Sequence, residues 1–165
     1  MGTLQRDAAK EADRILRLAW GDRGIPVDPA KVAHRLGIKV FEAELESDLS
    51  GALVKELAED PAILLNTHDS VNRQRFTCAH ELGHYVRRSA DLDQYEYVDK
   101  RDALAAAGTD PEEIFANSFA AALLMPEAEV RAWAKRGYDE IELASKFGVS
   151  REAMHNRLNA LRLPG

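Results

Sequence analysis

The chain has 165 residues, and 45% of them are hydrophobic, which is enough for a single domain with a buried core. Its formal net charge is −6 and it contains no basic block, which argues against a protein whose main partner is a nucleic acid backbone. Cys78 is the only cysteine, which excludes a disulfide within the chain; no apolar run is long enough for a signal peptide or a membrane span, so we expect a cytoplasmic protein.

The first half of the chain predicts two helices and a small sheet. Apolar residues recur at helical spacing from residue 4 to residue 20, and Gly21 ends that helix. Asp28 and Pro29 begin a short second helix that ends at Gly37. Short apolar runs then predict about three strands, the last two joined as a hairpin, at residues 38–45, 51–57 and 62–66.

The second half is predicted to be mainly helical. A long helix is expected from residue 69 or 70 to about residue 88, and a polar, weakly periodic segment follows it at 89–108. The remaining elements are a helix at 111–125, a short helix at 127–136 and a helix-turn-helix-like pair at 139–163 with its turn at Gly148. The sequence therefore predicts an α+β fold, mainly helical, with residues 1–137 as one domain and the C-terminal helices of 138–165 packed on it.

One motif carries chemistry: RFTCAHELGHYV at residues 75–86. His80 and His84 are one helical turn apart, so both imidazoles lie on one face and can reach a single tetrahedral Zn²⁺. Glu81 is rotated by about 100° from His80, which suits a general base better than a ligand. Gly83 is unfavourable in the middle of a helix, and its missing side chain would let a facing helix or a substrate approach.

Two histidines do not complete a catalytic zinc site, which usually has three protein ligands. The helix at 111–125 is apolar nearly all round after its first turn, so a carboxylate on it would need a partner. Glu113 is a candidate third ligand, and Asn117, one turn later, is placed to orient a ligand. Glu113 also occupies the capping-box position after Asp110, so spacing alone leaves cap and ligand equally open.

Together, RFTCAHELGH (75–84) and EIFANSFAAALLMP (113–126) resemble the ImmA/IrrE family of metallo-endopeptidases. The family pairs an HExxH helix with a later E-x-x-A-N-x-F-A-A stretch that ends in L-L-M-P. Ala122 departs from the glutamate often found at that position, and the departure does not touch the inferred ligands. The resemblance implies a zincin-like domain and extends over most of the chain, although only these two motifs are specific.

What the resemblance implies can be assigned residue by residue. His80, His84 and Glu113 would hold one Zn²⁺, with Mn²⁺ as a possible substitute, and Glu81 would act as the general base. The substrate would be a helix-turn-helix repressor or an antitoxin-like partner encoded nearby, whose cleavage relieves repression. The alternative is a non-catalytic binding module of a toxin–antitoxin-like pair that keeps the metallopeptidase fold; the retained Glu81 favours the enzyme.

Other features leave alternatives open. Tyr85, Tyr95 and Tyr97 are all candidate donors to the reaction intermediate, and each is also explained by packing or exposure. The segment 89–108 is either a lid or a solvated loop. An extended peptide could add to a free edge of the sheet. The tail at 139–165 has no net charge, which favours docking of protein over DNA. Cys78 is expected in the core, and the remaining histidines are treated as ordinary residues: His34, His68 and His155.

Overall fold

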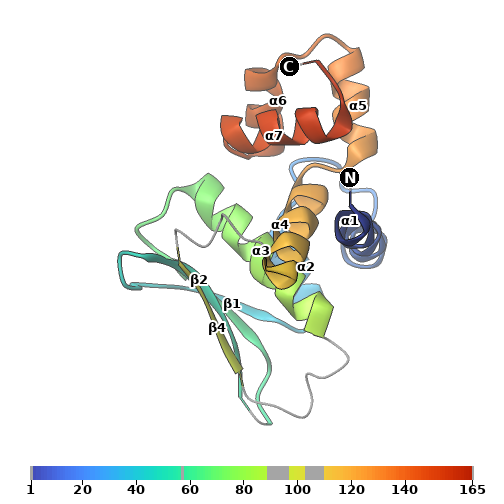
Figure 1. Ribbon diagram of the computed structural model, residues 1–165. Coiled ribbons are helices and arrows are strands. Elements are labelled where there is room, and N and C mark those ends of the chain that lie inside the picture. Colours follow the sequence, from blue (N-terminus) through green and yellow to red (C-terminus); the bar gives the residue numbers. More distant parts are fainter. Residues whose placement is uncertain (1, 57, 89–96, 103–109, 165) are drawn as a thin grey trace.

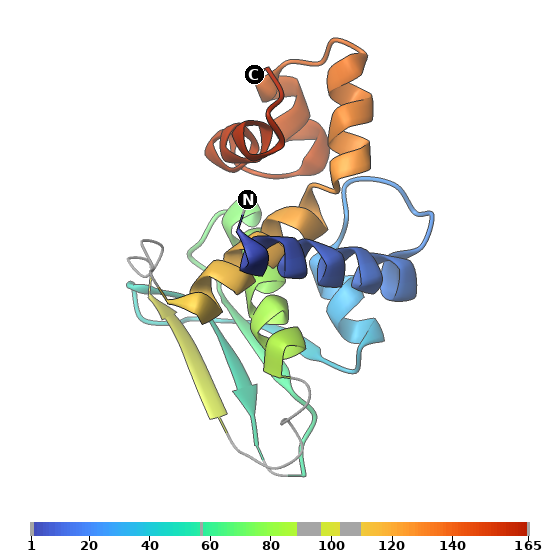
Figure 2. The same cartoon turned by 45° about the vertical axis from the view of Figure 1, so that its right-hand side comes forward.

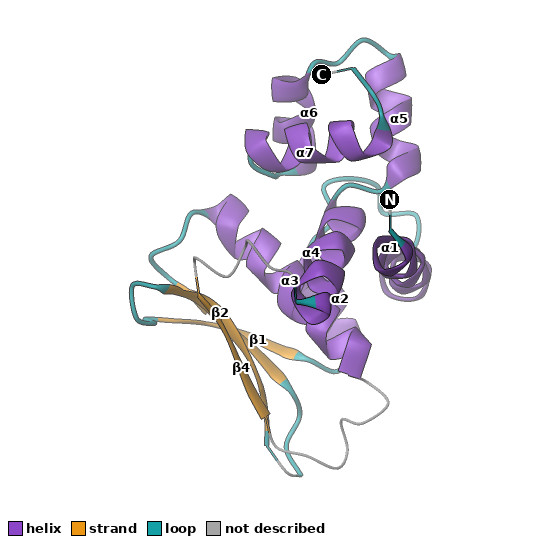
Figure 3. Cartoon of the chain, in the orientation of Figure 1, coloured by secondary structure: helices purple, strands orange, loops and turns teal. Residues whose placement is uncertain are grey.

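The computed structural model describes residues 2–56, 58–88, 97–102 and 110–164, with the backbone alone for 97–102 (Figures 1 and 3). The helices are α1 (Thr3–Ile15), which continues into a π-helical turn η1 (Leu16–Trp20), α2 (Pro29–Arg35), α3 (Val71–Arg88), α4 (Pro111–Leu124), α5 (Glu127–Lys135), α6 (Glu140–Phe147) and α7 (Arg151–Leu161). The strands are β1 (Lys39–Ala43), β2 (Leu49–Lys55), β3 (Ala62–Asn66) and β4 (Tyr97–Asp102).

The sheet has four strands in the order β1-β3-β2-β4. The expected hairpin is present, since β2 pairs antiparallel with β3. β1 pairs in parallel with the other side of β3. The fourth strand, β4, pairs antiparallel with β2 and lies inside the segment 89–108, which the sequence predicted to be irregular. The prediction of about three strands was therefore one short, and the outer strands of the described sheet are β1 and β4.

The layers follow the apolar faces of the helices. α3 lies on β2 and β3, α4 packs on α3, and α1 packs on α4 on the side away from the sheet (Figure 1). α1 buries Ala8, Ala12 and Ile15, which recur at helical spacing along one face. The α+β prediction is confirmed, with helices as the larger part. Within the described ranges, none of the helices combines the length and the apolar character needed to span a bilayer.

α3 and α4 run antiparallel and come unusually close at Gly83. A Cβ atom added there would lie 3.0 Å from the Ala116 Cα atom and 3.2 Å from the Phe119 Cβ atom. The contacting pairs run in opposite directions along the two helices, from Arg87 with Glu112 to His80 with Asn117. The glycine that costs helix propensity in the sequence is therefore the position where the backbone of α4 approaches α3.

Gly83→Ala is expected to destabilise the metal-free protein by up to about 2 kcal/mol. The gain in helix propensity is about 1 kcal/mol, but overpacking against a neighbour that cannot rotate away costs about 1–3 kcal/mol. Here the neighbour is the Ala116 backbone, so the two helices must separate. Urea unfolding of both metal-free proteins measures the difference; a variant as stable as wild type would show that α4 yields without cost.

The C-terminal helices stack above α3 and α4, close to the N-terminus (Figure 2). Asp139 and Glu142 form a capping box at the start of α6, and Gly148 ends that helix in the left-handed conformation with φ 65°. Ser150 then caps α7 by accepting a hydrogen bond from the Ala153 amide. The turn between α6 and α7 lies at Gly148, as the sequence predicted, and Ser150 begins the next helix directly after it.

Arginine side chains fasten this tail to the two central helices. Arg75 of α3 donates to the Gly148 carbonyl at 2.9 Å and to the Val27 carbonyl at 2.7 Å. Arg157 of α7, which is 8% exposed, donates to the Met125 carbonyl at the end of α4 over 3.0 Å. Burial lowers the pKa of both guanidinium groups, while the nearby carboxylates of Asp28 for Arg75, and of Glu127 and Asp13 for Arg157, act in the opposite direction.

Candidate metal centre

Three side chains from two helices meet where α3 contacts α4. His80 and His84 lie in the middle of α3, and Glu113 lies in the first turn of α4. The Nε2 atoms of the two histidines are 3.0 Å apart. Glu113 Oε1 lies 3.1 Å from His84 Nε2, and Glu113 Oε2 lies 3.4 Å from His80 Nε2. The fold therefore brings two imidazoles and a carboxylate to one point.

The separations among these donors fit one tetrahedral ion. Zn²⁺ binds histidine nitrogen and carboxylate oxygen at about 2.0–2.2 Å, so two ligand atoms on a tetrahedral ion lie about 3.3–3.5 Å apart. The two Nε2 atoms are 3.0 Å apart, and each lies 3.1 or 3.4 Å from a different oxygen of Glu113, which are separations of the same order as that edge length. In the part of the chain that the structure describes, no other group of His, Cys, Asp or Glu gathers three such atoms. Three protein ligands also leave a fourth coordination position for water or substrate.

Burial gives the centre a closed side and an open side. His80 and His84 are 0% and 2% exposed, whereas the Glu113 side chain is 19% exposed. Glu81, which follows His80 on α3, is 1% exposed. Among these side chains, Glu113 is therefore the one open to solvent, while Glu81 is held inside the protein next to His80 in the sequence.

The two neighbouring glutamates at the start of α4 have different surroundings. Asp110 caps the helix by accepting a hydrogen bond from the Glu112 amide at 3.0 Å. The Glu112 side chain accepts a hydrogen bond from Arg87 Nε, a pairing that the sequence did not single out. The Glu113 carboxylate instead lies against the histidines. Of the two roles considered for Glu113, this placement favours a metal ligand over a helix cap.

Asn117 holds the ring of His80. Its Oδ1 atom is 2.9 Å from His80 Nδ1. Because an amide oxygen only accepts, the imidazole donates from Nδ1–H, and the lone pair is then on Nε2, the atom that faces His84 and Glu113. The hydrogen bond selects the tautomer that can bind a metal, which is the contact expected of a group that orients a ligand.

Asn117→Ala is expected to weaken metal binding by about 10–100-fold, because losing such an orienting partner typically costs this much. Competition with a fluorescent chelator measures the zinc affinity of each variant. Ser118→Ala, at the next position of the same helix, removes a polar group that no ligand contacts and is the matched control. Equal affinities in all three proteins would show that the Asn117 amide does not orient His80.

The comparisons with known proteins agree with this geometry. Residues 33–159 match the family model Peptidase_M78, described as an IrrE N-terminal-like domain. The chain belongs to this family. No curated protein matches it in sequence. The chain is also similar in structure to a Mycobacterium tuberculosis transcriptional regulator, with a TM-score of 0.64 and 22% identity. The match covers 93% of this chain and 46% of the regulator, so the chain spans about half of that protein and shares its fold.

The other residues considered in the sequence are not among the converging donors or lie outside the described parts. Cys78 is 1% exposed in the core, and burial raises the pKa of its thiol to about 12, which leaves it protonated and unreactive at neutral pH. Tyr85 packs against the hydrophobic core. Tyr95 lies outside the described residues, and only the backbone of Tyr97 is described. The structure therefore tests neither as a donor to the reaction intermediate.

His155 is more than the isolated surface histidine that its spacing suggested. Its Nδ1 atom is 2.7 Å from Glu140 Oε2, and its Nε2 atom is 3.0 Å from Asn159 Nδ2. Arg151 donates to the other oxygen of Glu140. The hydrogen bonds from Arg151 and from His155 lower the pKa of the Glu140 carboxyl, and the bond from Arg151 has the larger effect. The cluster joins the first turns of α6 and α7 and lies apart from the metal ligands.

Proposed function

We propose that this protein is a zinc-dependent endopeptidase. The observation that carries the proposal is the convergence of His80, His84 and Glu113 at tetrahedral spacing with Glu81 buried beside them. Two imidazoles and one carboxylate form a donor set of the kind that catalytic zinc sites use, and the same set also accepts Mn²⁺. Membership of a peptidase-type family agrees with this chemistry.

When bound, the ion would supply Lewis acidity, which lowers the pKa of a water molecule and polarises the scissile carbonyl. Glu81 would accept the proton of that water and deliver it to the departing amine. Its burial keeps the carboxylate in a fixed place and excludes competing solvent. Asn117 would keep His80 in its metal-binding tautomer throughout, so no reorganisation of the ligands is needed during the reaction.

The substrate we propose is a cytoplasmic helix-turn-helix repressor or an antitoxin-like partner encoded nearby. Support comes from the resemblance of the two motifs to the ImmA/IrrE family, and from the name of the related structure, a transcriptional regulator. That name describes the other protein, which is about twice as long as this chain. A protein substrate also suits the sheet, because its outer strands β1 and β4 offer an edge to an extended peptide.

The tail is proposed to contact protein rather than DNA, because three of its four basic side chains have partners within the chain. Arg151 is paired with Glu140, and Arg157 is buried against the Met125 carbonyl. The Lys146 ammonium lies 3.9 Å from the centre of the Trp133 ring, in cation–π contact. Phosphate binding needs a surplus of accessible positive charge, which these contacts leave small.

A direct test uses zinc-loaded protein and the helix-turn-helix protein encoded by the neighbouring gene. We expect fragments of the partner by mass spectrometry, none of them after chelation, and renewed cleavage after Zn²⁺ or Mn²⁺ is restored. A partner that is bound and regulated but stays intact under all of these conditions would favour the non-catalytic binding module.

A further inference from the structure

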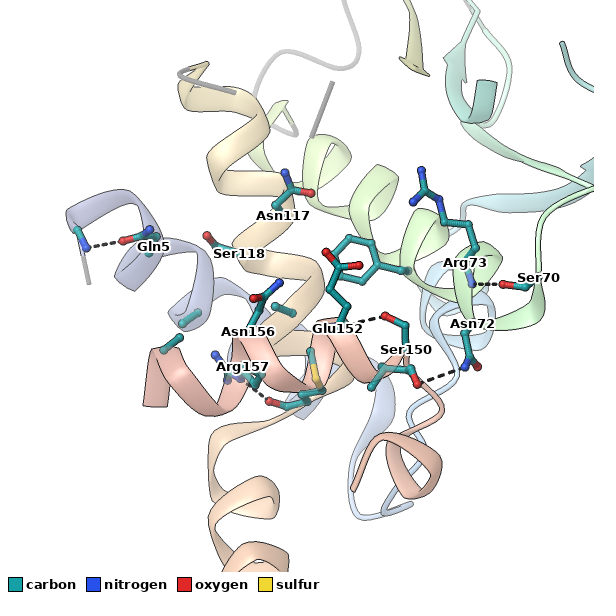
Figure 4. Close-up of a pocket in the computed structure, with 18 residues that line it drawn as sticks. Gln5, Ser70, Asn72, Arg73, Asn117, Ser118, Ser150, Glu152, Asn156 and Arg157 are labelled. Carbon is teal, nitrogen blue, oxygen red and sulfur yellow. Dashed lines mark hydrogen bonds between the residues drawn. The ribbon is translucent and has the colours of Figure 1, made fainter. Parts of the chain in front are cut away.

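A cavity of about 880 Å³ lies between the two ligand helices and α7 (Figure 4). We call it the α7 groove. One wall comes from the N-terminal part of α3 and the C-terminal part of α4, the other from α7, and the start of α1 closes one end. The central lining residues are Arg73, Phe76, Asn117, Ala121, Glu152 and Asn156.

The α7 groove continues the line of the metal ligands. On α3, His84 and His80 are followed in the N-terminal direction by Phe76 and Arg73, at intervals of three or four residues that keep one helix face. On α4, Glu113 is followed in the C-terminal direction by Asn117, Ala121 and Met125 at intervals of four. Because α3 and α4 are antiparallel, both series leave the metal centre in the same direction and enter the groove.

Asn117 lies both at the metal centre and in the α7 groove. Its Oδ1 atom binds His80 Nδ1, and the residue also lines the groove. Figure 4 shows it at the upper end of the groove, on the same helix as Ser118. A polypeptide that crosses the metal centre would therefore pass Asn117 and continue between α3, α4 and α7.

The lining suits an extended peptide. Phe76, Ala121 and Met125 supply apolar contact, and serine and asparagine side chains supply donors and acceptors for main-chain amides: Ser70, Asn72, Asn117, Ser118, Ser150 and Asn156. A volume of about 880 Å³ holds a short segment of chain and excludes a folded domain.

Among the charged residues of the groove, Glu152 differs from the arginines. Arg73 donates to Ser50 Oγ, and Arg157 donates to the Met125 carbonyl, so both guanidinium groups are engaged with the protein. The Glu152 carboxylate points from α7 into the groove (Figure 4). Within the described structure it takes part in no hydrogen bond or ion pair, and it stays exposed. The arginines keep their positive charge because both acceptors are neutral, so Glu152, the one carboxylate among the described lining residues, is the group that can pair with a positively charged side chain.

We propose that the α7 groove binds the substrate segment on one side of the scissile bond, with a lysine or arginine side chain of that segment paired with Glu152. The inference rests on the proposed endopeptidase function. It gives the helix-turn-helix-like tail a role in choosing the peptide, because α7 forms one wall of the substrate cleft.

The test uses a library of proteome-derived peptides digested by the zinc-loaded full chain. Wild type is expected to favour lysine or arginine at one fixed position relative to the cut, by on the order of tenfold. Glu152→Lys is expected to favour aspartate or glutamate at that same position. Glu129→Lys is the matched control, because Glu129 is also an exposed glutamate in the first turn of a helix but does not line the groove.

A binding measurement separates this inference from the proposed function. Zinc-loaded Glu81→Gln protein is applied to an array of peptides with basic, neutral or acidic residues, and the amount of protein captured by each peptide is measured. Adding Asn156→Trp, which fills the groove, is expected to reduce this capture at least about tenfold. Cleavage by wild type with unchanged profile and capture in the Glu152 and Asn156 variants would overturn the groove and keep the endopeptidase. Capture of basic peptides that depends on Glu152, without any cleavage, would overturn the endopeptidase and keep the groove. The absence of both cleavage and Glu152-dependent capture would overturn both proposals.

Discussion

Replacing Glu81 with glutamine is expected to abolish peptide cleavage while leaving the metal content unchanged. Glutamine has nearly the same shape as glutamate but cannot accept a proton, and general base catalysis by a positioned side chain contributes about 10²–10⁴-fold to the rate. Glu81 lies outside the three-residue donor cluster, so the substitution removes none of the metal ligands. The rate of appearance of fragments and the zinc content of the same sample measure the two effects.

Glu112→Gln is the matched control for this experiment. Glu112 lies next to Glu113 and undergoes the same chemical change, but its side chain is paired with Arg87 and is not one of the converging donors. We expect it to keep most of the activity. Cleavage by Glu81→Gln at the wild-type rate would remove Glu81 from the reaction. Full regulation of the partner by an inactive Glu81→Gln protein would show that contact, and not cleavage, is the function.

The parts of the fold that the sequence predicted are those with local causes. His80 and His84 share a face because a helix turns by about 100° per residue, whatever packs on it. Asp28 and Pro29 at the start of α2, and Gly148 after α6, are signals that act within one turn, and the structure has helix ends at each of them. Gly83 was also informative, since a glycine in mid-helix needs a packing reason, and the approach of α4 supplies it.

β4 was missed because its cause is not local. Its sequence, YVDKRD, shows no clear alternation of apolar and polar residues, and the strand exists through pairing with β2, more than 40 positions earlier in the chain. The sequence predicted that the tail packs on the rest of the chain, but the contacts that attach it were not identified, for a related reason. Arg75 and Arg157 bond to main-chain carbonyls 73 and 32 residues away. Every residue has a main-chain carbonyl, so the residue type does not show which one accepts such a bond.

The candidate site also depends on contacts between segments that are far apart in the sequence. Spacing alone left Glu113 open between cap and ligand, because α4 had not been placed relative to α3. The structure brings its carboxylate to 3.1 Å from His84 Nε2, through a contact between helices that no periodicity predicts. The α7 groove was invisible in the sequence, since its two walls come from segments that only tertiary packing brings together.

Glu113→Gln is expected to lose metal at concentrations that saturate wild type, with a fall in affinity of more than about 100-fold. Losing a partner that only orients a ligand costs about 10–100-fold, and Glu113 lies among the donors themselves. The stabilisation that metal brings should disappear with it: at a free metal concentration of 100 times the dissociation constant this amounts to about 2.7 kcal/mol in wild type. Zinc content and the zinc-dependent shift in Tm measure both effects.

Glu142→Gln distinguishes a ligand from a helix cap at Glu113. Glu142 occupies the same third position of a helix, and its carboxylate accepts a hydrogen bond from the Asp139 amide in a true capping box. This variant is expected to keep its full zinc content and to lose less than about 1 kcal/mol of stability, because glutamine can accept the same hydrogen bond and only the negative charge at the helix N-terminus is removed. If Glu113→Gln behaves in the same way, with full metal occupancy and a small loss of stability, Glu113 is a cap, and the third ligand of the centre must come from elsewhere in the chain.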